Sequence, residues 1–301
     1  MQAKTIEKHL SKKMFDWLET IAKDDKQLAD DVRKNYLISG GSIANLLLGE
    51  EVNDYDIYIQ DRDVLMRLCQ HYAKDTPLQI LDGDKREDYL RDYHNENEDA
   101  LISARHIAIK TLKPGQIKFY DPETKGAGVA FNKGATEEQL KEYIPVFISP
   151  NAISLSNKVQ IVNRFHGTPE QIHETFDFIH ATNYFTHNDG LQCNVPALLS
   201  LMTKTLKYQG SHYPVTSIIR LKKFLNRKFR ISAGEILKIL VQVSQLDLLD
   251  PEVLEEQLIG VDIAYFSTLI TALRNVKDHT PTEEYLFTMI DRIFGDSPIT
   301  E

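Results

Sequence analysis

Two neighbouring stretches decide the fold, Asn35-Tyr-Leu-Ile-Ser-Gly-Gly-Ser-Ile-Ala-Asn-Leu-Leu-Leu-Gly49 and Asp54-Tyr-Asp-Ile-Tyr-Ile59. The first predicts a short strand over 35–39 that stops at Gly40-Gly41. A helix over 42–48 follows at once and ends at Gly49. The second stretch alternates polar and apolar residues, which predicts another strand. A strand, a glycine turn, a helix and a second strand therefore follow one another in the chain.

The glycine turn is suited to an anion. Gly40 and Gly41 allow backbone N–H groups to approach a phosphate closely, and the N-terminus of the next helix adds a favourable field. Ser42 supplies a hydroxyl for the same phosphate. We expect these three residues to bind the phosphates of a nucleotide.

The second strand carries a pair of acids. Asp54 and Asp56 are two residues apart, so both carboxylates project from the same face of the strand. Two adjacent carboxylates repel each other unless a cation lies between them. Mg²⁺ or Mn²⁺ prefers such oxygen ligands. A metal beside a bound triphosphate suits in-line phosphoryl or nucleotidyl transfer.

This spacing resembles the signature of the DNA polymerase β-like nucleotidyltransferase superfamily. That signature is a glycine followed by glycine or serine, then nine to thirteen residues, then Asp-hydrophobic-Asp. Gly41-Ser42, an eleven-residue gap and Asp54-Tyr-Asp56-Ile match it over residues 36–60. The resemblance implies an α+β fold, with a mixed or antiparallel sheet flanked by helices. It also implies Mg²⁺ or Mn²⁺ as cofactor and a nucleoside triphosphate as partner.

The same resemblance implies a third carboxylate on a neighbouring strand. It would bind metal and activate the attacking hydroxyl. Asp177 is the first choice, because it is a lone acid in the apolar stretch 176–185, which predicts a strand. Asp121 is the second choice, although Pro122 and Glu123 after it favour a turn.

The rest of the chain divides into three parts. Residues 1–34 open with an amphipathic helix over 5–22, and residues 35–194 form the nucleotidyltransferase-like core. Eight acids in 82–99 predict a solvated insertion within that core. Residues 195–301 predict successive amphipathic helices, which look like the helical module of template-independent members of the superfamily. Capping patterns at 61, 136, 168, 232 and 280 mark helix starts.

One predicted helix in this last part is strongly basic. It carries Arg220, Lys222, Lys223, Arg227, Lys228 and Arg230. Arg220 and Lys223 are candidate ligands of the triphosphate, and the cluster as a whole is a candidate surface for an RNA acceptor. The alternative is a solvated helix face balanced by nearby acids.

Composition excludes other classes. A net charge of −9 argues against general coating of nucleic acid, and no apolar run is long enough to span a bilayer or to serve as a secretory signal. Two cysteines, Cys69 and Cys193, cannot form a disulfide framework, so we expect packing roles and a cytoplasmic location. Histidines recur every seven residues from 166 to 187, but Gly167 and Pro169 break that segment, so the spacing predicts no metal site.

The leading hypothesis is a metal-dependent nucleotidyltransferase that moves a nucleoside monophosphate to an acceptor hydroxyl and releases pyrophosphate. Three alternatives remain open at this point. They are an inactive nucleotide-binding protein of the same fold, a toxin or defence enzyme that modifies tRNA or a protein, and an assembly protein in which the acid pair is accidental.

Overall fold

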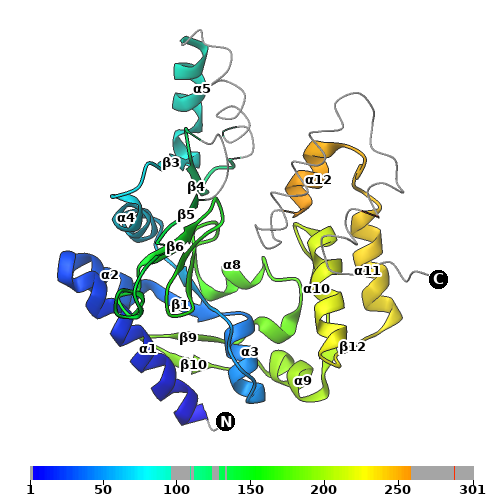
Figure 1. Ribbon diagram of the computed structural model, residues 1–301. Coiled ribbons are helices and arrows are strands. Elements are labelled where there is room, and N and C mark those ends of the chain that lie inside the picture. Colours follow the sequence, from blue (N-terminus) through cyan, green and yellow to red (C-terminus); the bar gives the residue numbers. More distant parts are fainter. Residues whose placement is uncertain are drawn as a thin grey trace. The chain divides into compact units, whose positions relative to one another are not determined.

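The computed structural model describes residues 3–95, 109, 112–123, 129–132, 134–258 and 288, and it divides the chain into two compact units (Figure 1). Unit 1 comprises Met1–Glu174 and His180–Met202, and unit 2 comprises Thr175–Ile179 and Thr203–Glu301. Several predictions fall outside the described residues: the strand over 104–111 (apart from residue 109), the helices over 262–275 and 282–294 (apart from residue 288), the capping pattern at 280 and residues 96–99 of the acidic insertion.

Unit 1 is built on an eight-stranded mixed sheet. Its order is β10-β9-β1-β2-β8-β7-β6-β5. All neighbouring pairs are antiparallel except β2 and β8, which run parallel. The bounds, in chain order, are β1 Tyr36–Ser39, β2 Tyr55–Ile59, β5 Val129–Ala130, β6 Pro145–Ile148, β7 Ala152–Leu155, β8 Val159–Val162, β9 Tyr184–Thr186 and β10 Gly190–Gln192. The predicted α+β class with a mixed, mainly antiparallel sheet is confirmed.

Helices α1, α3 and α4 pack against strands of this sheet, and unit 1 also contains a second sheet of two strands. The helices are α1 Ala3–Asp24, α2 Lys26–Asn35, α3 Gly41–Leu48, α4 Arg62–Ala73, α5 Arg86–Asn95, α7 Glu137–Leu140, α8 Pro169–His173 and α9 Val195–Thr203. The second sheet pairs β3 Gln79–Asp82 with β4 Ile117–Tyr120. The predicted caps at Asp61, Thr136 and Thr168 all accept a hydrogen bond from their helix.

The main core lies on one face of the large sheet. Helix α1 buries Ile6, Leu10, Met14, Trp17, Leu18 and Ile21, at the spacing that predicted it. Each such side chain contributes about 1.5–3 kcal/mol when fully buried. Ile38 of β1 and Ile57 of β2 belong to the same cluster. Alternation along a strand therefore turns Ser39 and Asp56 to the opposite face.

One prediction about local structure is wrong, and a second holds for only part of its stretch. The stretch 176–185 is not one strand, because only Tyr184–Thr186 pairs in the sheet, a 3₁₀ turn (η2) covers Ile179–Ala181, and Phe178 bridges to Tyr208 in unit 2. The apolar residues that suggested a strand thus serve two separate units. The acidic stretch 82–99 is not simply a solvated excursion: Asp82 is buried and ion-paired with Arg62, and a 3₁₀ turn (η1, Gly83–Lys85) leads into α5.

Unit 2 is mainly helical. Its described helices are α10 Pro214–Asn226, α11 Ala233–Val243 and α12 Pro251–Leu258, and Ser232 caps α11 as its sequence predicts. Two short parallel strands, β11 Thr205–Leu206 and β12 Arg230–Ile231, were not predicted. In the part of the chain that the structure describes, no helix has the length and apolar character needed to cross a membrane.

Candidate functional site

The glycine turn after β1 lies beside Asp56 of β2. Ser39 and Asp56 face each other across the two antiparallel strands. Gly40 has a positive φ of 84°, which side chains other than glycine tolerate poorly. A methyl group added at Gly40 would lie 3.5 Å from Asp56 Oδ2. The sequence predicted this juxtaposition, and the register of the two strands produces it.

The turn also starts a helix whose first residue, Gly41, is exposed. Gly40 is the N-cap of α3, and no side chain caps the helix there. A methyl group added at Gly41 would meet no atom within 4 Å. Ser42 is buried, and its hydroxyl donates to Ser39 O at 3.4 Å. Because Ser42 uses its hydroxyl inside the turn, backbone N–H groups are the donors best suited to an incoming phosphate.

Asp54 and Asp56 are two residues apart at the start of β2, an interval that turns both side chains to one face of an extended strand. Asp54 is exposed and immediately precedes β2, while Asp56 is half-buried within it. Both offer carboxylate oxygens, which suit Mg²⁺ or Mn²⁺. The close approach of Gly40 leaves space beside Asp56 that any side chain at residue 40 would fill. These donors and this space fit a divalent metal. Among the residues that the structure describes, no group of three or more His, Cys, Asp or Glu is arranged to hold a metal ion, so this site offers two carboxylates.

The strand that neighbours Asp56 on its other side carries no carboxylate. Gln160 of β8 lies opposite Asp56 in the parallel register. The described strand β8 reads Val-Gln-Ile-Val. The residue opposite Asp56 on this neighbouring strand is therefore a neutral amide.

The two sequence candidates for that acid lie outside the large sheet. Asp121 follows β4 of the two-stranded sheet, and its carboxylate accepts from Glu123 N at 2.9 Å, as in a turn start. Asp177 belongs to unit 2, where its carboxylate accepts from Ser211 Oγ at 2.9 Å and from Arg220 Nη1 at 2.5 Å. Its side chain is only 3% exposed. Asp177 is thus a buried acid with two firm partners.

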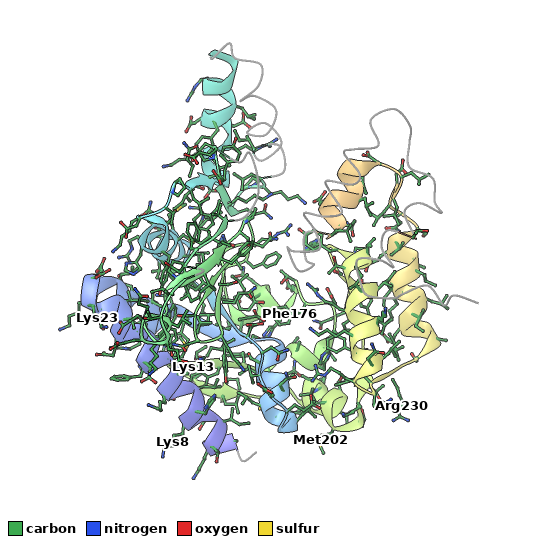
Figure 2. All side chains as sticks on the ribbon, viewed as in Figure 1. Lys8, Lys13, Lys23, Phe176, Met202 and Arg230 are labelled. Atoms are coloured by element: carbon green, nitrogen blue, oxygen red, sulfur yellow. The ribbon has the colours of Figure 1, made fainter. Side chains whose placement is uncertain are left out.

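The basic residues proposed for nucleotide binding lie on α10 of unit 2. Arg220 is paired with Asp177, and Lys223 is exposed one turn later. Before and after α10 in the chain, Lys204 and Arg227 lie over the Phe229 ring, at 5.7 and 5.9 Å from its centroid. Figure 2 labels Arg230 on the β12 segment that follows. Several cations are thus gathered between β11 and the C-terminal end of α10.

Sequence reasoning missed one residue on the Asp56 face. His173, the last residue of α8, lies 2.9 Å from Ser39 Oγ through Nε2, and its ring lies 5.6 Å from that of Tyr184. Burial lowers the pKa of His173 to about 4, so the imidazole is neutral at pH 7. Only the pairing of β1 with β9 and the position of α8 bring these residues together.

Solved structures with similar chain paths are tRNA-processing proteins. A tRNA-processing enzyme with CTP is 14% identical, with a TM-score of 0.40 over 91% of this chain and 59% of that one. The Thermotoga maritima CCA-adding enzyme complexed with tRNA is 15% identical, with a TM-score of 0.39 over 83% of this chain and 49% of that one. A tRNA nucleotidyltransferase complexed with a primer tRNA and an incoming ATP analog is 14% identical, with a TM-score of 0.36 over 80% and 57%. The chain spans only about half to three-fifths of the length of these proteins.

No curated protein matches the chain. A family model described as "Gad2: Gabija anti-defense 2 family protein" matches residues 8–204. These residues include all eight strands of the large sheet and the Gly40–Asp56 site. The chain belongs to the Gabija anti-defense 2 family.

Proposed function

We propose that this protein is a metal-dependent nucleotidyltransferase. It would transfer a nucleoside monophosphate from a nucleoside triphosphate to an acceptor, with pyrophosphate leaving. The observation that carries this proposal is the contact between the Gly40 turn and Asp56, where a methyl group at residue 40 would lie 3.5 Å from the carboxylate. The backbone N–H groups that would bind phosphate and the carboxylate that would bind metal are therefore close enough to contact the same nucleotide.

Each residue of the turn and of the acid pair has a separate task. Asp54 and Asp56 would hold Mg²⁺ or Mn²⁺, which supplies charge stabilisation to the triphosphate when bound. Gly40, Gly41 and Ser42 would orient the phosphates with backbone N–H groups at the start of α3. In-line displacement then needs the acceptor oxygen aligned with the bond to pyrophosphate.

We propose a different task for Asp177 than that of third metal ligand. Its carboxylate already accepts from Arg220 and Ser211, which balances its charge inside unit 2. Asp177 would fix the Arg220 guanidinium on α10, so that Arg220 and Lys223 present positive charge to a phosphate group bound at α10.

RNA is the acceptor class that the charge distribution favours. No Asp or Glu occurs between Asp189 and Glu235, although the whole chain has 44 acids, and eight Lys and Arg lie in that interval. Lys207, Lys223, Lys228 and Arg230 form no ion pair with an acid within the described ranges. Like charges held together without acids repel, and a phosphate backbone removes that cost.

The family supports a second candidate for the acceptor. Its description names an action against a defence called Gabija, so a protein or nucleic acid of that defence would be the modified partner. This would make the chain an enzyme that inactivates a defence component. The neutral Gln160 beside Asp56 supports the remaining alternative, a non-catalytic nucleotide-binding protein of the same fold.

Transfer of label from nucleotide tests the proposal and separates these candidates. The protein is incubated with each α-labelled nucleoside triphosphate, Mg²⁺ or Mn²⁺, and either total RNA or the components of the defence. Label on RNA favours the first acceptor, and label on a defence protein favours the second. Binding of the nucleotide with no label on any acceptor and no pyrophosphate contradicts catalysis and favours the binding protein.

A further inference from the structure

We infer that His173, acting through Ser39, is a positioning residue that holds the Gly40-Gly41 turn in its nucleotide-binding geometry. The inference rests on the proposed function, because it assigns a role in nucleotide binding by the same turn. His173 itself contacts the Ser39 hydroxyl and the Tyr184 ring.

Ser39 is the centre of a buried network. Its side chain has no solvent exposure. Its Oγ lies 2.9 Å from His173 Nε2, 3.0 Å from Asn183 O and 3.3 Å from Ala181 O. The two carbonyl oxygens can only accept, and the hydroxyl has one proton to donate. When that proton goes to a carbonyl, His173 Nε2–H donates to a lone pair of Ser39 Oγ, so the imidazole satisfies the remaining capacity of the hydroxyl.

The Ala181 carbonyl also accepts a hydrogen bond from the glycine turn. Gly40 N–H donates to Ala181 O at 3.1 Å, and Ala181 lies in the short 3₁₀ turn η2 before β9. Ser39 and Gly40 are thus tied to the same segment by adjacent hydrogen bonds. Because Gly40 has a φ of 84° and borders Asp56, a displacement of Ser39 moves the turn relative to the acid pair.

The position of His173 is set by its own helix. Thr168 and Gln171 form a reciprocal capping box at the start of α8, with Pro169 in the first turn. Ile172 is fully buried and anchors α8. An imidazole at the end of a capped and anchored helix is a rigid support, and it is neutral because burial disfavours its charged form.

The residues opposite Ser39 on the two neighbouring strands support the positioning role of His173. Ser39 is opposite Asp56 on one side and opposite Tyr184 on the other, and His173 contacts both Ser39 and Tyr184. The side chains of directly opposite residues lie on the same face of a sheet. His173 therefore contacts residues on the same face of the sheet as Asp56.

Nucleotide affinity of conservative and disruptive variants tests the inference. Binding of MgATP is measured for wild type, His173→Gln, His173→Leu, Ser39→Ala and the Ser39→Ala/His173→Leu double variant, with His71→Leu on α4 as the matched control. Gln can place an amide group near the position of Nε2, whereas Leu cannot. We expect about 10-fold weaker binding for His173→Leu, less than about 3-fold for His173→Gln and no change for His71→Leu.

The double variant and the folded state distinguish positioning from general damage. If His173 acts through Ser39, His173→Leu has less than about a 2-fold further effect in the Ser39→Ala background, and thermal unfolding remains cooperative. Wild-type affinity in His173→Leu, or an equal loss in both backgrounds, would overturn the inference.

Hydrogen exchange gives a readout that does not need nucleotide. We expect the Gly40 amide, which donates to Ala181 O, to exchange faster in His173→Leu and at the wild-type rate in His173→Gln. An unchanged exchange rate of the Gly40 amide in His173→Leu contradicts the positioning role of His173, whether or not nucleotide binds. Wild type that binds no nucleotide and releases no pyrophosphate instead contradicts the proposed function, and the exchange rates still decide whether His173 holds the turn.

Discussion

Asp177 and Arg220 form an ion pair with an Oδ2–Nη1 distance of 2.5 Å inside unit 2. Sequence patterns assigned the acid to a metal site and the arginine to a nucleotide. The structure instead pairs them with each other, with the carboxylate almost fully buried and the guanidinium 42% exposed. A buried carboxylate is costly unless it is paired and hydrogen-bonded, so this pair is first a feature of the packing of α10.

Removing either partner of this pair is expected to destabilise unit 2. Arg220→Ala leaves the Asp177 carboxylate buried with Ser211 as its described side-chain donor, and we expect a loss of about 2–4 kcal/mol. Asp177→Asn is expected to cost less, since a neutral amide is easier to bury. Urea unfolding measures both. A stable Asp177→Asn protein whose metal-dependent turnover has vanished would restore Asp177 as a metal ligand.

Two adjacent glycines are expected to respond differently to alanine. Gly40→Ala should cost about 1–2 kcal/mol because residue 40 has a φ of 84°, and it should also weaken nucleotide binding by crowding Asp56. Gly41→Ala should leave stability nearly unchanged, since its methyl meets no atom within 4 Å. If phosphate lies against Gly41, that methyl still weakens binding. Thermal unfolding and nucleotide titration of both variants check this, and full affinity in Gly41→Ala would place the phosphate elsewhere.

The neutral state of His173 predicts a pH dependence of stability. Its pKa in the folded protein is lowered to about 4 from 6.5, mainly by burial, while Glu170 opposes the shift. The unfolded chain therefore binds more protons between these values, and stability falls as pH drops from about 6.5 towards 4. Unfolding temperatures measured across this range should fall less steeply in His173→Gln. Identical slopes in both proteins would show that His173 is not buried in its neutral form.

The basic surface of unit 2 predicts salt-sensitive binding of RNA. Replacing Lys223, Lys228 and Arg230 by Gln should weaken binding of a single-stranded RNA and make the dependence of log K on log salt shallower by about 2, at about 0.7 per lost phosphate contact. The matched control replaces Lys4, Lys8 and Lys26, which are exposed on α1 and α2 (Lys8 is labelled in Figure 2). Equal losses in both triple variants would indicate a general charge effect, and no RNA binding by wild type would favour a protein acceptor.

Sequence alone predicts the features that are contiguous in the chain. The turn at Gly40, the acid pair at Asp54 and Asp56 and the caps at Thr136 and Thr168 depend on residues a few positions apart, and these predictions of local structure hold. The position of Gln160 beside Asp56 depends instead on a parallel pairing of distant strands. No local pattern encodes that register.

The error at 176–185 has the same origin. Phe178 and Asp177 have the apolar-acidic pattern of a buried strand, but their partners are Tyr208, Phe224 and Arg220 in unit 2. The seven-residue spacing of the histidines gives no sign of the contact between His173 and Ser39, which depends on the fold that brings α8 to β1. Burial and long-range pairing determine which partners these residues have.

Pyrophosphate release is the most direct test of the central claim. Wild type, Asp54→Asn/Asp56→Asn and the charge-matched control Asp63→Asn/Asp75→Asn are compared with each of the four ribonucleoside triphosphates, Mg²⁺ or Mn²⁺ and total RNA or defence components. We predict release by wild type and by the control, and a loss of at least about 100-fold in the Asp54/Asp56 variant. Release that persists unchanged in the folded Asp54→Asn/Asp56→Asn protein would contradict a nucleotidyltransferase site at this pair.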